Sequence, residues 1–177
     1  MALSENAKEW IKDIVIAVVL AALILVFIKP TIVREHSMEN TLHDGDYLFV
    51  SRQQYKLFNK APQRGDIVVF SSDLESSTGA NKLLIKHIIG VPGDIVEIYD
   101  GIVYVNDEAL NEPYTKDGYT DSDMYPVEVP ENCLFCMGDN RQNSTDSRDG
   151  RVGFISMDDV MGKAVFRIFP FNQIGTL

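Results

Sequence analysis

A lysine lies inside an otherwise apolar stretch of the chain, in the segment LLIKHIIG that spans residues 83–90. The segment is short, rich in β-branched residues and followed by the turn-like sequence VPGD, so it predicts a β-strand. Alternate side chains of a strand share a face, so Lys86 points the same way as Leu84 and Ile88. Burial among apolar side chains disfavours the ammonium form and lowers its pKa, in extreme cases by about 3–5 units, and a neutral amine is a general base. The alternative is a lysine at a sheet edge whose amine reaches water.

Two polar segments could complete a site around such a base. Ser37 lies in the segment REHSMENTL, directly after the only strongly hydrophobic span of the chain. Residues 137–153, MGDNRQNSTDSRDGRVG, form an unusually polar loop that is punctuated by glycines and flanked by apolar sequence. A serine hydroxyl is a poor nucleophile until a neighbouring base accepts its proton, and a serine–lysine pair is one known solution. In isolation, Ser37 would be interpreted as an ordinary turn serine.

In this order, the three segments resemble the type I signal peptidases, membrane-bound serine–lysine proteases that remove signal peptides from exported proteins. In that family a Ser-Met pair carries the nucleophile, and a Lys followed by a basic residue and Ile-Gly-x-Pro-Gly-Asp carries the base. A block of the form Gly-Asp-Asn-Arg-x-x-Ser-x-Asp-Ser-Arg supports both. The resemblance extends from the hydrophobic span to about Arg167. It implies that Ser37 attacks the scissile carbonyl while neutral Lys86 accepts the proton and passes it to the leaving amine.

The resemblance also implies supporting residues in the glycine-punctuated loop. Ser144 should hydrogen-bond the Lys86 amine and orient it. Asp146 and Arg148 lie two residues apart on one side of an extended loop, where they should form a partly buried ion pair. The shape of the same loop is attributed to Asp139 and Asn140.

The substrates implied by the resemblance are membrane-tethered preproteins that are cut after small side chains, commonly Ala-x-Ala. Shallow apolar pockets would receive the residues one and three positions before the cut, and their lining is assigned to Val33, Met38, Leu84 and Ile85. No metal ion or other cofactor is implied. The expected partners are signal-peptide-bearing preproteins and membrane lipid, and the protein is expected to be a monomer.

Two residues near the predicted nucleophile depart from the family pattern. The position two before the nucleophile is usually Gly or Ser, which helps to form the oxyanion hole, but here it is Glu35. A carboxylate would repel the developing oxyanion, so we expect Glu35 to point away and the hole to depend on the backbone N–H of Ser37. Alternatively, Glu35 pairs with Arg34 or Arg141 and fixes the turn. The second departure, Asn40 in place of the family's proline, makes the turn less rigid.

Two other functions remain as alternatives. A related serine–lysine protein that cleaves itself is disfavoured by a permanent anchor and by the Gly-Asp-Asn-Arg block. A catalytically idle, membrane-tethered module could hold preproteins in the same groove, and Glu35 and Asn40 are the residues that would suit it.

Histidines and cysteines suggest rival chemistry. His36 adjoins Ser37 and His87 adjoins Lys86, but adjacent side chains of an extended segment diverge, which disfavours a serine–histidine pair. The sequence Cys-x-x-Cys at residues 133–136 lacks the second pair of ligands that a structural zinc needs. Its two cysteines would face opposite sides of a strand, which disfavours a disulfide. We therefore expect two free thiols.

An apolar span near the N-terminus predicts a membrane anchor. Residues 14–28 are uninterrupted apolar sequence, about 22 Å of helix against a hydrocarbon core of roughly 30 Å. Trp10, Lys12 and Lys29 at the two ends could make up the difference. A cleavable export signal would need small residues at its end, but KPTIVR follows. We therefore assign residues 1–30 to a cytoplasmic N-terminus and a single permanent transmembrane helix.

Residues 31–177 are predicted to form one all-β catalytic domain of coiled antiparallel sheets. The charges flanking the span are balanced, so its extracytoplasmic placement at the cell membrane comes from the resemblance. A net charge of −10 argues against nucleic acid as a partner. Asp100-Gly101 predicts a type I′ hairpin turn. The predicted strands are 47–50, 66–70, 83–89, 95–99, 102–105, 133–137 and 163–168.

Overall fold

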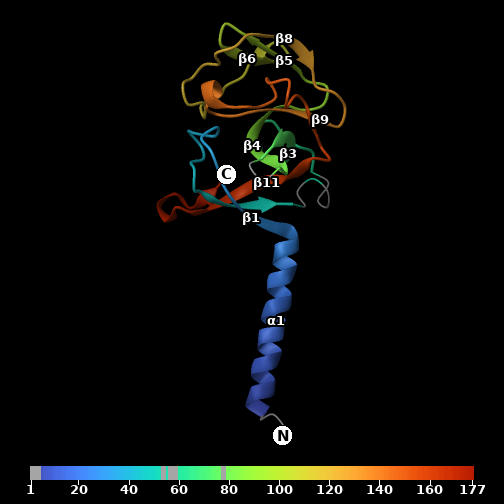
Figure 1. The fold of residues 1–177 in the computed structure, drawn as a ribbon, viewed down its shortest axis with the longest axis vertical. Helices are drawn as coiled ribbons and strands as arrows, with labels where there is room; N and C mark the ends of the chain where they lie inside the picture. Colours follow the sequence, from blue (N-terminus) through green and yellow to red (C-terminus); the bar gives the residue numbers. More distant parts are fainter. Residues whose placement is uncertain (1–4, 53–54, 56–59, 77–78) are drawn as a thin grey trace.

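A single long helix precedes a β-rich body in the computed structural model, which describes residues 5–52, 55, 60–76 and 79–177 (Figure 1). Helix α1, Glu5–Phe27, extends away from the sheets. Its segment Asn6–Phe27 has a mean hydropathy of 2.6 and is not buried inside the protein, so by length and composition it could cross a membrane. These 22 residues span about 33 Å, which matches a hydrocarbon core of roughly 30 Å better than the shorter apolar run did.

The helix ends earlier than the sequence predicted. Strand β1, Ile28–Ile32, follows α1 directly and pairs with β2, Tyr47–Ser51. Lys29 and Pro30, which were assigned to the anchor, instead lie opposite Val50 and Phe49. The proline is tolerated because β1 is an edge strand of its sheet, where a missing N–H breaks no ladder. Hydropathy alone does not separate the last turn of an apolar helix from an apolar strand.

The larger sheet has eight strands and carries most of the core. Its order is β1-β2-β11-β3-β4-β9-β10, with β12 added beside β11, and all its ladders are antiparallel. Short 3-10 helices lie at Arg141–Asn143 and Phe171–Gln173. The remaining strands of this sheet are β3 Ile67–Glu75, β4 Asn81–Gly90, β9 Cys133–Met137, β10 Ile155–Ser156, β11 Val160–Phe169 and β12 Gly175–Thr176.

A smaller antiparallel sheet lies at the end of the body far from α1 (Figure 1). Its order is β7-β6-β5-β8. Asp100 and Gly101 connect β5 to β6 with φ angles of 50° and 76°, which confirms the predicted type I′ turn. The strands are β5 Ile95–Tyr99, β6 Ile102–Val105, β7 Glu108–Ala109 and β8 Met124–Glu128.

The observed elements confirm an all-β domain behind one N-terminal apolar helix. Strands β5, β6 and β9 have the predicted bounds, whereas β3 and β4 are longer and run into the polar segment between them. Strands β7, β8, β10 and β12 were not predicted, since they are short or polar, and β1 was missed because its sequence continues the apolar helix. Beneath the site, one of three buried clusters contains Val33, Met38, Leu42, Leu48, Ile67 and Ala164.

Candidate active site

Lys86 is buried in the middle of the larger sheet. It lies on β4, between β3 and β9, and opposite Val68 of β3. Its side chain is 1% exposed, so the alternative of an edge lysine that reaches water is wrong. The amine Nζ lies 2.6 Å from Ser37 Oγ, at hydrogen-bonding distance. The strand assignment therefore brings together the two residues that the sequence singled out.

Burial shifts the titration of this amine. Desolvation lowers the pKa of Lys86 from 10.5 to about 8, although the carboxylates of Asp146 and Glu35 oppose the shift. The Lys82 cation on the same strand adds to the lowering. A substantial fraction of the amine is therefore neutral at slightly alkaline pH, as the sequence predicted.

Ser37 lies in a turn that buried side chains fix from below. Met38 is 1% exposed and Leu42 is fully buried, and both pack in one cluster with Val33. The backbone N–H of Leu42 donates to the carbonyl of Met38 over 2.8 Å, which closes the turn. This packing places the Ser37 hydroxyl above the core and toward β4.

The Gly-Asp-Asn segment ties this turn to the rest of the site. The backbone N–H of Asn140 donates to the Ser37 carbonyl over 3.1 Å, and its side-chain amide donates to the His36 carbonyl over 3.2 Å. The Asp139 carboxylate accepts from the backbone N–H of Thr41 over 3.3 Å. Asp139 and Asn140 therefore hold the nucleophile turn, a contact that sequence reasoning did not foresee.

Gly138 makes the closest approach in the site. A Cβ at this position would lie 2.4 Å from the Ser37 carbonyl oxygen and 2.3 Å from Ser144 Oγ. Its backbone N–H donates to the Asp146 carboxylate over 3.0 Å. We did not include Gly138 among the functional residues, although a glycine inside a strand-to-loop segment is a signal of close backbone approach.

The predicted ion pair of Asp146 and Arg148 is present. The guanidinium donates twice to the carboxylate, over 2.8 and 2.9 Å, and the Asp146 side chain is fully buried. Burial raises the pKa of Asp146, but the paired Arg148 outweighs it and holds that pKa below its usual value. Arg148 also donates to the Arg141 carbonyl over 2.8 Å, so the pair braces the loop.

The predicted hydrogen bond between Ser144 and Lys86 is absent. Ser144 Oγ is buried and makes no hydrogen bond to Lys86, and the Ser144 side chain instead helps to lower the pKa of Asp146. The Lys86 amine is directed to Ser37 instead, while Ser144 packs against Gly138. This expectation, which came from the resemblance, is not met by the geometry.

Neither histidine is paired with the serine hydroxyl. His87 Nδ1 lies 2.6 Å from Asp139 Oδ1, and its ring stacks on Tyr114 with centroids 4.1 Å apart. His36 Nδ1 lies 2.6 Å from Glu39 Oε1 at the surface. The arrangement favours lysine over histidine as the partner of the hydroxyl.

Glu35 has a different partner from those expected. Its carboxylate lies 2.5 Å from Lys82 Nζ of β4, whereas Arg141 pairs with Glu112. Its backbone has a φ of 77°, in the left-handed region that residues with a Cβ rarely adopt, and its N–H donates to Asp44 Oδ1 over 3.0 Å. A Gly at this position, usual in the family, would adopt this conformation freely.

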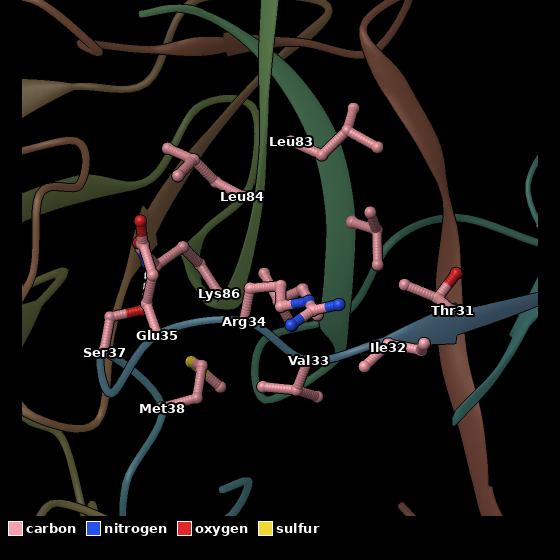
Figure 2. A pocket seen from close by; sticks show the side chains of 12 residues that line it. Thr31, Ile32, Val33, Arg34, Glu35, Ser37, Met38, Leu83, Leu84 and Lys86 are labelled. Atoms are coloured by element: carbon pink, nitrogen blue, oxygen red, sulfur yellow. Dashed lines mark hydrogen bonds between the residues drawn. The ribbon is translucent and has the colours of Figure 1, made fainter. Parts of the chain in front are cut away.

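The four residues predicted to bind substrate line one cavity beside Ser37 and Lys86 (Figure 2). The cavity has a volume of about 190 Å³. Its apolar wall comes from the chain after α1 on one side and from β3 and β4 on the other. The predicted lining residues are Val33, Met38, Leu84 and Ile85, joined by Thr31, Ile32, Val69 and Leu83.

The described residues hold no group of three or more His, Cys, Asp or Glu side chains that could bind a metal ion. Cys133 and Cys136 are free thiols, as predicted, and Cys136 is buried.

Comparison with known proteins gives concordant matches. A family model described as "Signal peptidase, peptidase S26" matches residues 7–169. Signal peptidase I of Bacillus licheniformis is 42% identical over 178 positions, covering 94% of this chain and 90% of that protein. Signal peptidase I S of Bacillus subtilis is 42% identical and covers 96% of this chain and 93% of that protein. A crystal structure of a signal peptidase I from Enterococcus faecalis is 32% identical, covering 59% of this chain and 97% of that one, with a TM-score of 0.48.

Proposed function

The chain belongs to the peptidase S26 family of signal peptidases, and on this premise we propose that Ser37 and Lys86 form the dyad with which it cleaves signal peptides. Membership makes it a serine-type signal peptidase. The observation that carries the assignment of the dyad is the 2.6 Å contact between Ser37 Oγ and the buried Lys86 amine.

The proposed reaction proceeds through an ester. Neutral Lys86 accepts the hydroxyl proton as Ser37 Oγ attacks the scissile carbonyl, and the lysine then gives this proton to the leaving amine. Water attacks the resulting acyl-enzyme ester while Lys86 again accepts a proton, which releases the signal peptide and restores the serine. The backbone N–H of Ser37 would donate to the oxyanion, and one such donor is worth about 3 kcal/mol.

The supporting residues act on the dyad through the backbone. Asn140 holds the carbonyl of the nucleophile itself, and Asp139 holds the far side of the turn. The Asp146–Arg148 pair fixes the loop that carries Asp139 and Asn140, because the Asp146 carboxylate accepts a hydrogen bond from the N–H of the preceding Gly138. We assign these residues to positioning, since it is the neighbouring Ser37 and Lys86 that would meet the substrate.

The cavity suits small side chains before the cut. In an extended peptide, the residues one and three positions before the scissile bond point to the same side, and the residue between them points away. Replacing alanine by tryptophan at either of the two outer positions of a preprotein should lower cleavage at least about tenfold, because the shallow pockets implied by the resemblance would clash with an indole ring. The same replacement at the middle position is the matched control and should have little effect. Equal cleavage of all variants would contradict this assignment of the cavity.

The apolar helix and the signal peptidase relatives fit a membrane-anchored protein. We propose that α1 is a single-pass anchor with the catalytic domain on the extracytoplasmic side, acting as a monomer on preproteins held in the same bilayer. The cavity lining starts at Thr31, shortly after α1 ends at Phe27, so an anchor at α1 would place the site near the membrane surface. A substrate tethered by its own signal peptide could reach this cavity directly.

The rate should rise with pH as Lys86 loses its proton. Below the pKa of this amine the base is protonated and inactive, and above it the base is neutral, so kcat/KM should increase with a midpoint near 8. An ordinary lysine would give a midpoint near 10.4. The check is the pH profile of preprotein cleavage by the full chain in lipid, with His36→Ala and His87→Ala as comparison variants. A rising limb that is lost in either histidine variant would favour histidine as the base.

A further inference from the structure

One ion pair joins the two segments that carry the proposed dyad. Glu35 precedes Ser37 by two residues, and Lys82 lies on β4 four residues before Lys86, on the same face of the strand. The Glu35 carboxylate and the Lys82 amine lie 2.5 Å apart, and their side chains are 49% and 33% exposed. The pair therefore connects the nucleophile turn to the base strand directly above the site.

The backbone at Glu35 gives a second reason to assign the pair a role. Its φ of 77° lies in a region that L residues rarely adopt, and the surrounding contacts must hold it there. Two contacts do so, the N–H donated to Asp44 and the ion pair with Lys82. A carboxylate kept in this conformation two residues before the nucleophile points to a function of its side chain.

The pair also borders the space through which substrate must pass. Glu35 lines both the apolar cavity and an adjoining polar cavity of about 510 Å³, and Lys82 lines the polar one. Both cavities reach Ser37 and Lys86. Figure 2 shows the Glu35 side chain beside the contact between these two residues.

Charges from several elements act on the Lys86 amine. Asp146 of the loop after β9 and Glu35 of the nucleophile turn raise the pKa of Lys86, while Lys82 of β4 lowers it. The Cys136 thiol of β9 is buried, which raises its pKa and keeps it neutral. Within the ion pair, the effects of the carboxylate and of the ammonium on the base therefore oppose each other.

We propose that Glu35 and Lys82 are a positioning pair, which clamps the Ser37 turn to β4 and keeps the charge beside the base balanced. This inference rests on the proposed dyad and adds two residues to its support. It also explains how a chain with a carboxylate so near the oxyanion hole could remain active, because Lys82 neutralises that carboxylate.

The test compares pH profiles of kcat/KM for preprotein cleavage by Glu35→Gln, Lys82→Met and the double variant, using the full chain in lipid at low ionic strength. Glu35→Gln leaves the Lys82 cation unpaired, so the midpoint should fall by about half a pH unit or more. Lys82→Met leaves the carboxylate unpaired, so the midpoint should rise by a similar amount. The double variant should return close to the wild-type midpoint, because the two opposite shifts cancel. In all three variants the plateau value of kcat/KM at high pH should be lower than in the wild type by roughly threefold or more, because the clamp is lost.

Matched controls come from another exposed ion pair, that of Asp149 and Arg151. Asp149→Asn and Arg151→Gln remove the same charges farther along the chain and should leave the midpoint unchanged. Lys82→Arg keeps the cation and should keep the wild-type midpoint. If Glu35→Gln does not fold, the comparison of Lys82→Arg with Lys82→Met still tests the proposal.

Two outcomes would overturn the inference. Midpoints that stay the same or shift in the same direction in both single variants would exclude the charge balance. A plateau equal to wild type in both would exclude the clamp. Either result, with Lys86→Ala inactive, refutes the pair while the dyad stands, whereas an active Lys86→Ala refutes the dyad itself.

Discussion

Ser37→Ala and Lys86→Ala are each expected to lower kcat for preprotein cleavage by at least about 1,000-fold, the scale seen when one member of a catalytic unit is removed. The reason is the 2.6 Å contact between the two side chains: without the hydroxyl there is no nucleophile, and without the buried amine no base accepts its proton. The measurement is cleavage of a preprotein by the full chain in detergent or lipid, followed by gel and by N-terminal sequencing of the product.

The double variant should lose little more activity than either single one, since residues that act as a unit are not additive. Ser122→Ala and Lys60→Ala are suitable controls, because both positions are exposed, and they should retain wild-type turnover. Circular dichroism should show that the inactive variants are folded. Substantial activity in Lys86→Ala would remove lysine from the mechanism.

Gly138→Ala is expected to lower turnover by about 100-fold or more and to destabilise the fold by roughly 1–3 kcal/mol. The new Cβ would lie 2.4 Å from the carbonyl oxygen of Ser37 and 2.3 Å from Ser144 Oγ, so the backbone must move. The displaced groups are the nucleophile turn and the N–H that donates to Asp146. The checks are kcat on a preprotein and the thermal unfolding midpoint.

Gly150 provides the matched control for this substitution. It lies in the same glycine-punctuated loop, but a Cβ there meets no atom within 4 Å. Gly150→Ala should therefore leave both turnover and stability near wild type. If the two alanine variants behaved alike, the close approach at Gly138 would have no catalytic importance.

Local sequence predicted much of the fold, whereas the pairing of Ser37 with Lys86 came from the resemblance to a known family. A lysine in a β-branched apolar run predicted a strand but left an edge position open, and the structure places Lys86 buried on β4, inside the sheet. The hairpin of β5 and β6 followed from Asp100-Gly101, since that dipeptide suits the two positive φ angles of its turn. Other strands were predicted from the apolar pattern of their own residues.

Contacts between distant segments could not be predicted in this way. The Asn140 amide reaches the His36 carbonyl across 104 positions of sequence, and the partner of Glu35 is set by the register of β4. The resemblance predicted a hydrogen bond from Ser144 to Lys86, but the Lys86 amine is bonded to Ser37 Oγ instead. Such side-chain pairings depend on the tertiary packing of strands and loops, which cannot be inferred from a local sequence pattern.

Ser37 should carry the acyl group during the reaction, which can be tested by measuring the mass of the enzyme quenched in acid during turnover of a signal-peptide ester. An ester at the scissile bond acylates faster than an amide, so the intermediate should accumulate. The enzyme should gain a mass equal to the acyl part of the substrate, located on the proteolytic fragment that contains Ser37 and absent from Ser37→Ala. Hydrolysis of the ester with no adduct, or with the adduct on another residue, would contradict this prediction.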